Sequence, residues 1–105
     1  MYSFVKQPVD TLDYDLDMSD WFSDLIIDEI SSITITITSP TEASPTLISG
    51  SASHPPYTLL GNNPVSAKLW LSQGTVNTTY IVTCVVFTKQ DRVKEVEFKI
   101  KVRNL

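Results

Sequence analysis

Three aspartates at alternate positions have the spacing that most resembles a chemical site. Asp13, Asp15 and Asp17 match the first ligands of a calcium-binding loop. Such a loop also needs a glycine at its sixth position and usually a bidentate glutamate at its twelfth. Met18 and Asp24 stand at those positions. We therefore interpret the aspartates as the polar face of a strand and expect no metal ion.

The single cysteine and the single histidine lack the neighbours that catalysis requires. Cys84 lies in the most hydrophobic run of the chain, where a thiol behaves as a small apolar core group. His54 stands before two prolines in a region without clustered acids or a second histidine. The chain also has no Gly-x-Ser-x-Gly elbow and no glycine-rich phosphate loop. These observations predict a protein that is not an enzyme and holds no cofactor.

The length and the amino-acid composition, with a hydrophobic fraction of 42%, indicate one globular domain over residues 1–105. No run approaches the roughly 18 apolar residues of a membrane span, and the first ten residues lack the apolar core of a signal peptide. We therefore expect a protein outside the general secretory route, in which the sequon Asn77-Thr78-Thr79 is a chance match.

Acidic and basic side chains occupy different parts of the chain. Residues 1–64 hold nine acids and one base, and residues 65–105 hold three acids and seven bases. The division fits two solvated faces, or copies that associate head to tail. Because the bases alternate along one strand without a platform of stacking aromatics, we expect no nucleic-acid partner.

Alternating apolar residues predict an all-β fold. The stretch 65–102 reads as three consecutive antiparallel strands, at 65–71, 80–87 and 96–102, with Phe98 in the core. Further strands are predicted at 12–18 and 30–38 and a short one at 46–51. Residues 19–26 are predicted to form a helical turn that Ser19 caps.

Two segments leave alternatives open. Residues 1–9 suit either a mobile N-terminal arm that docks on a neighbour or a short edge strand. Residues 39–64 contain five of the six prolines and form a long loop region.

The run 80–87 is apolar on both faces, so something must cover its second face: the long loop, the N-terminal arm or another subunit. Trp70 interrupts the polar face of its own strand and is predicted to join the same patch. The candidate interface residues are Tyr2, Phe4, Trp21, Phe22, Trp70, Ile81, Val85 and Phe87.

Several of these motifs resemble one family. Residues 12–22 (LDYDLDMSDWF), 67–75 (AKLWLSQGT) and 79–83 (TYIVT), with a final alternating strand, are similar to small virion proteins of tailed bacteriophages labelled fibre-tail adaptor or small structural protein. The chain departs from the usual pattern at Met18, where that pattern has tryptophan, and at Gln73, where it has glycine. The turn from Gly74 to Tyr80 also resembles the tyrosine corner of immunoglobulin-like domains.

The resemblance implies an immunoglobulin-like antiparallel β-sandwich in the virion, made in the cytoplasm of a host bacterium. It implies a non-enzymatic structural protein, present in several copies, that bridges tail or neck to fibres through contacts with other phage proteins and without a membrane partner. A capsid decoration protein that staples shell subunits is the first alternative. A carbohydrate-binding module is the second, with Trp70 as its only fair candidate for sugar stacking.

Overall fold

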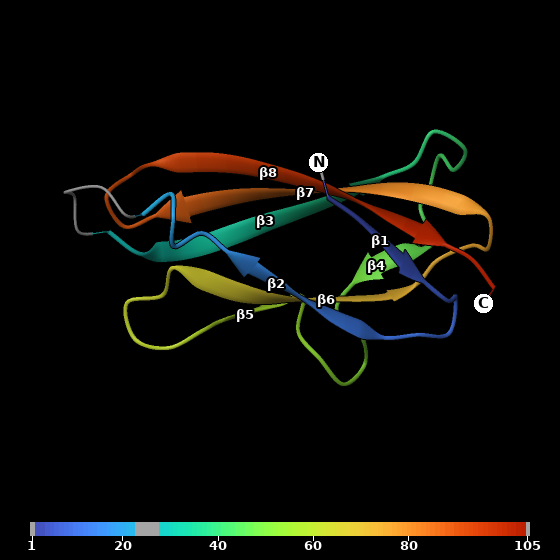
Figure 1. The fold of residues 1–105 in the computed structure, drawn as a ribbon, viewed down its shortest axis with the longest axis horizontal. Coiled ribbons are helices and arrows are strands. Elements are labelled where there is room, and N and C mark those ends of the chain that lie inside the picture. The colour runs from blue at the N-terminus through green and yellow to red at the C-terminus, as the bar shows by residue number, and fades with distance from the viewer. Residues whose placement is uncertain (1, 23–27, 105) are drawn as a thin grey trace.

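The computed structural model describes residues 2–22 and 28–104. The regular secondary structure of these residues consists of β-strands, arranged as two sheets that face each other (Figure 1). The strands are β1 (Tyr2–Lys6), β2 (Leu12–Asp17), β3 (Ile30–Thr38), β4 (Leu47–Ser49), β5 (Tyr57–Leu59), β6 (Ser66–Gln73), β7 (Thr78–Thr88) and β8 (Val93–Val102). The described part of the chain has no helix with the length and apolar character needed to cross a membrane.

The first sheet has the order β1-β8-β7-β3, and the second has β2-β6-β4 with β5 also paired to β6. The all-β class is therefore confirmed. The expectation of a purely antiparallel fold is wrong at one pair, because β1 runs parallel to β8. A parallel neighbour is possible here because the chain crosses to the second sheet directly after β1 and returns to β8 only at its end.

The stretch 65–102 does not form three successively paired strands as predicted. β7 and β8 pair with each other, but β6 belongs to the opposite sheet. The turn between β6 and β7 carries the chain across the core, with positive φ at Gln73 (64°) and Gly74 (107°). A Cβ on Gly74 would lie 2.8 Å from a methyl group of Val102, so this crossing requires glycine.

The core lies between the sheets and is fixed by alternation along β7. The side chains of Tyr80, Val82, Cys84 and Val86 are fully buried, as the sequence pattern predicted. They meet inward residues of β6 and β8, such as Leu69. Burial raises the pKa of the Cys84 thiol to about 11, so it stays protonated and unreactive at neutral pH.

The first residues form an edge strand, which is one of the two alternatives left open for 1–9. β1 pairs with β8 from Phe98 to Val102. The Lys6 side chain is buried at its end, and its Nζ donates hydrogen bonds to the carbonyl oxygens of Gln7 (2.7 Å), Pro8 (3.3 Å) and Gln73 (2.5 Å). Burial of Lys6 lowers the pKa of its ammonium. These contacts tie the N-terminal segment to the sandwich.

The region 39–64 supplies two short strands to the second sheet. β4 lies within the stretch 46–51 predicted as a strand, while β5 has no counterpart among the predicted strands. β5 is three residues long and follows Pro55-Pro56, so its sequence shows no alternating run that would reveal it.

The turn after β2 contains a side-chain hydrogen bond, in which the carboxylate of Asp17 accepts from the Ser19 N–H at 2.9 Å. Capping by Ser19 stays a prediction, because the predicted turn extends to residue 26, beyond the described residues. The Phe22 N–H donates to the Met18 carbonyl at 3.1 Å, which is a helical spacing. Leu25 and Ile26, also assigned to this turn, lie outside the described residues.

Phe98→Ala is expected to lower the free energy of unfolding by about 3–5 kcal/mol, because a large core side chain leaves a cavity. Phe98 is 6% exposed and contacts the rings of Phe4 and Tyr14. Urea denaturation of the purified chain measures the change. Val93→Ala is the control, since Val93 is 58% exposed on the same strand. Equal losses in the two variants would contradict this assignment of the faces of β8.

Candidate protein-interaction surfaces

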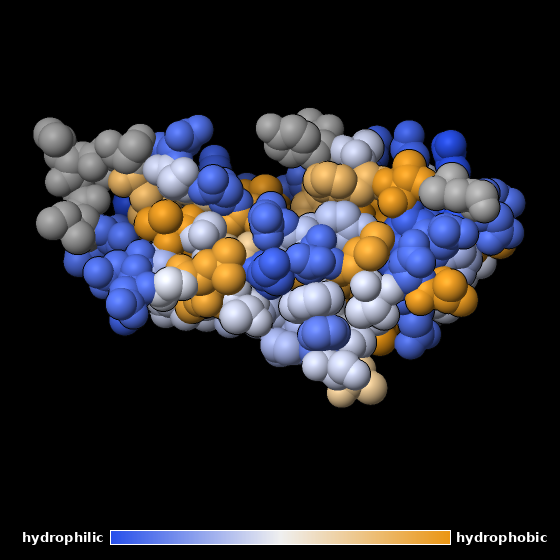
Figure 2. All heavy atoms as spheres, turned by 60° about the horizontal axis from the view of Figure 1, so that its bottom comes forward, coloured by the Kyte–Doolittle hydropathy of each residue, from blue (hydrophilic) through white to orange (hydrophobic). Residues whose placement is uncertain are grey.

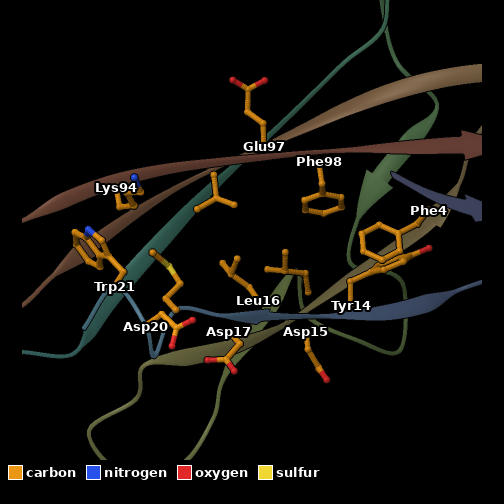
Figure 3. A pocket seen from close by; sticks show the side chains of 13 residues that line it. Phe4, Tyr14, Asp15, Leu16, Asp17, Asp20, Trp21, Lys94, Glu97 and Phe98 are labelled. Atoms are coloured by element: carbon orange, nitrogen blue, oxygen red, sulfur yellow. The ribbon is translucent and has the colours of Figure 1, made fainter. Parts of the chain in front are cut away.

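A hollow lies along one side of the sandwich, between β2 and the first half of β8, and has a volume of about 560 Å³. Figure 3 shows Tyr14, Leu16 and Phe98 directed into it from opposite sheets, with Trp21 at one end and Phe4 at the other. We call this hollow the β2–β8 groove. Its lining residues are Phe4, Tyr14, Asp15, Leu16, Asp17, Met18, Asp20, Trp21, Leu69, Lys94, Val96, Glu97 and Phe98.

Three aromatic rings close one end of the groove. The Phe4 ring is 5.0 Å from that of Tyr14 and 5.8 Å from that of Phe98. The hydroxyl of Tyr14 is buried without a hydrogen-bond partner among the described residues. Burial raises the pKa of Tyr14, and the nearby carboxylates of Asp10 and Asp13 raise it further. The hydroxyl therefore stays neutral beneath the Phe4 ring.

An ion pair holds the other end of the groove in place. The Arg92 guanidinium lies 4.6 Å from the centre of the Trp21 ring, and its Nε donates to Asp28 at 2.9 Å. The Trp21 ring packs edge-on against Phe22, with centroids 4.9 Å apart. Phe22 is 9% exposed and belongs to the core. Of this predicted pair, Trp21 therefore lines the groove while Phe22 supports it from beneath.

The outward face of β7 forms a second candidate surface. Ile81 and Val85 are half-buried and Phe87 is 38% exposed. The long loop contributes its strands to the other sheet and β1 lies at the edge of β8, so neither is stacked on this face. The exposed side chain of Val93 stands opposite Phe87 and extends the apolar area, which we call the outer β7 face.

Trp70 does not join that area, which corrects the prediction of a shared patch. It lies on β6 in the other sheet, and the reason is the crossing between β6 and β7. The His54 ring stacks on Trp70 at 3.6 Å, with 4° between the ring planes. A sugar could not stack on the covered face of Trp70. In Figure 2, which brings the lower sheet of Figure 1 forward, hydrophobic patches alternate with hydrophilic ones.

The side chains of Asp15 and Asp17 point away from the groove, although both residues border it (Figure 3). The Nζ of Lys68 lies 2.8 Å from Asp13 and 3.9 Å from Asp15, so a lysine ammonium occupies the position beside these carboxylates. Within residues 2–22 and 28–104, no group of three or more acidic, histidine or cysteine side chains is arranged to hold a metal ion.

The remaining candidate, Tyr2, occupies the first position of β1, beside Phe98 in the register. Phe4 and Trp21, which lie 17 positions apart in the sequence, line opposite ends of the groove. It also includes Tyr14, Val96 and Lys94, which the sequence reasoning did not select. The alternating pattern marked Val96 as a core residue, and the short pairing of β1 leaves it partly accessible.

Comparison with known families settles where the chain belongs. The family model described as Podophage GP4 fiber-tail adaptor protein gp77 matches residues 6–101, which is nearly the whole chain. The chain belongs to this family. The resemblance that the motifs near Tyr14 and Trp70 indicated is therefore confirmed. No curated protein gives a significant match.

Membership of the fiber-tail adaptor family assigns the chain a structural role in the phage virion. Membership of an adaptor family implies contacts with other proteins of the phage particle. The groove lies on the inward side of β8, whereas the outer β7 face lies on the outward side of the same sheet.

The Trp21 end of the groove is expected to weaken in acid. Burial by itself would raise the pKa of Asp28, but hydrogen bonds from Thr88, Arg92 and the backbone N–H groups of Glu29 and Gln90 outweigh it and lower that pKa from 3.8 to about 2. Because the pKa is depressed in the folded state, the stabilisation is complete above pH 4 and is lost as the pH falls toward 2.

Asp28→Asn removes this titration while keeping a similar side-chain volume. We expect the free energy of unfolding of the variant to depend less steeply on pH between 4 and 2 than that of the wild type. Denaturation at a series of pH values measures it, with Asp91→Asn as the control for an exposed aspartate. Parallel curves for wild type and Asp28→Asn would refute the role of the ion pair.

Proposed function

We propose that the chain is a non-enzymatic adaptor that bridges the phage tail or neck to the fibres by protein contacts. The observation that carries the proposal is the family match over residues 6–101. The structure supports it with two separated apolar areas, the β2–β8 groove and the outer β7 face. A bridging protein needs two such areas, because each partner must be held at the same time.

The fold proposed for this role is an immunoglobulin-like sandwich. In that fold the strands B, E and D share one sheet and C, F and G share the other. Taken in chain order, β2, β6 and β5 correspond to the first set and β3, β7 and β8 to the second. A tyrosine near the start of strand F supports this assignment, since the Tyr80 hydroxyl accepts a hydrogen bond from the Thr75 N–H at 2.9 Å.

The network around Tyr80 also joins the long loop to the core. Its hydroxyl donates to the carboxylate of Glu42, which accepts a second hydrogen bond from the Thr75 hydroxyl at 2.7 Å. These hydrogen bonds from Tyr80 and Thr75 lower the pKa of Glu42. The network therefore ties the loop to the sandwich at Glu42, which suits a rigid connector.

Antibody labelling of purified particles tests the location. We expect label at the tail vertex, in several copies, when an antibody against this chain is viewed by negative-stain microscopy. Label spread over the shell would instead identify a capsid decoration protein and would overturn the adaptor. Particles that lack the gene serve as the control for non-specific label.

Variants on the two apolar areas should give two different assembly defects. We expect one of Phe87→Asp and Val96→Asp to be absent from particles, and the other to be incorporated in particles that lack fibres. Each charge disrupts a different contact. Val9→Asp is the matched control, since Val9 is 90% exposed outside both areas. Immunoblots of gradient-purified particles measure both components, and identical phenotypes for the two variants would argue against a bridge.

A further inference from the structure

The first half of β8 is an open sheet edge. β7 pairs with β8 along nearly its whole length, but β1 pairs only from Phe98 to Val102. Residues Val93 to Glu97 therefore have a strand on one side only, within the part of the chain that the structure describes. Unpaired N–H and C=O groups on such an edge are a template for an additional strand.

The direction of the backbone groups on this edge follows from contacts at the end of β8. The Val102 carbonyl accepts from Asn77 on the β7 side, and the Arg103 N–H donates to Lys6 on the β1 side. Successive residues of a strand direct these groups to opposite sides. Odd-numbered residues of β8 therefore direct them away from β7, so the N–H and C=O of Val93 and Glu95 point to the open edge.

A strand added at this edge would alternate between two environments. Its inward side chains would enter the β2–β8 groove, against Leu16, Trp21 and Val96. Phe4 of β1 already does so at the closed end, where it covers Tyr14. The inward positions therefore favour apolar side chains.

The outward positions would lie beside two carboxylates. Glu95 and Glu97 point to the outer face, where their neighbours on β7 are the uncharged Val85 and Thr83. Neither carboxylate forms an ion pair with a described residue. Next to β1 the same face of β8 carries lysines instead. Opposite charges directly across a strand pair stabilise it, so the open half of the edge favours basic side chains.

We propose that the open edge of β8 binds an extended segment of a partner protein by strand addition, with apolar side chains alternating with lysine or arginine over about five residues. The proposal rests on the adaptor function for assigning that segment to a tail or fibre protein. The edge itself is a property of the isolated domain and is tested on it.

The probe is a seven-residue peptide of alternating lysine and valine, added to the isotope-labelled chain. We expect saturable binding in which amide exchange at Glu95 slows by about tenfold or more, because that N–H gains an acceptor. One control peptide has the same composition with its valines contiguous, and a second replaces lysine with glutamate. Equal binding of all three peptides, or protection located away from β8, would overturn the proposal.

Two changes separate the charge from the backbone contribution. Glu95→Lys with Glu97→Lys alters exposed side chains only, and should reverse the preference from the lysine peptide to the glutamate peptide. Glu95→Pro removes the N–H at the open edge, where proline is tolerated, and should abolish binding while Glu95→Ala retains part of it. If Glu95→Pro lowers the melting temperature, its loss of binding could reflect unfolding, and the peptide preference of the double lysine variant then decides whether the edge binds as proposed. An unchanged peptide preference in that variant overturns the proposal.

Particle assembly distinguishes this proposal from the adaptor function. Phage made with the double lysine variant should lose the chain if the tail binds the open edge, or the fibres if a fibre protein binds it. Normal fibres on such virions would overturn strand addition and leave the adaptor standing, whereas label on the shell would overturn the adaptor whatever the peptides do. Dimerisation of the pure chain that the lysine peptide disrupts would assign the edge to a second copy, and would also overturn the proposal.

Discussion

The burial of one face of β7 is the constraint on which the rest of the structure depends. Tyr80, Val82, Cys84 and Val86 are fully enclosed between the sheets, with β3 and β8 hydrogen-bonded on either side. Because side chains alternate along a strand, this burial forces Ile81, Val85 and Phe87 outward. The apolar outer face is thus coupled to the position of the core, and its exposure requires a reason outside the isolated domain.

The two halves of the β8 edge differ in whether a neighbouring strand covers them. β1 covers the second half of β8, and the buried Lys6 fastens its end to backbone carbonyls near Gln73. The first half of β8 stays open above a groove whose ends are fixed by the Phe4 ring and by the ion pair of Arg92 with Asp28. Natural sheets usually protect such edges. An edge left open beside an apolar groove therefore suits a protein whose role is assembly.

Prediction from the sequence succeeded where alternation is regular. The faces of β7 and of the buried half of β8, around Phe98, follow directly from period-2 patterns. The pattern could not show which strands pair, so β6 was placed beside β7 and Trp70 was assigned to the wrong sheet. Pairing depends on turns such as that at Gly74, where two successive residues with positive φ direct the chain across the core.

The groove was beyond prediction for a related reason. Phe4 and Trp21 were predicted as candidate interface residues, but the sequence does not show that they line the two ends of one groove. Val96 looks like a core residue in an alternating strand, and only the missing neighbour of β8 leaves it partly accessible. The pairing of Arg92 with Asp28 joins segments 64 positions apart, for which the sequence offers no local signal.

The central claim is that this domain works by being held between two partners. A reconstruction of the virion at the tail vertex, at a resolution that separates strands, tests it most directly. The account predicts a sandwich at the junction of tail and fibre, with foreign density beside Glu95 on the edge of β8 and a second contact over Phe87. A sandwich on the shell, or one with solvent at both places, would contradict it.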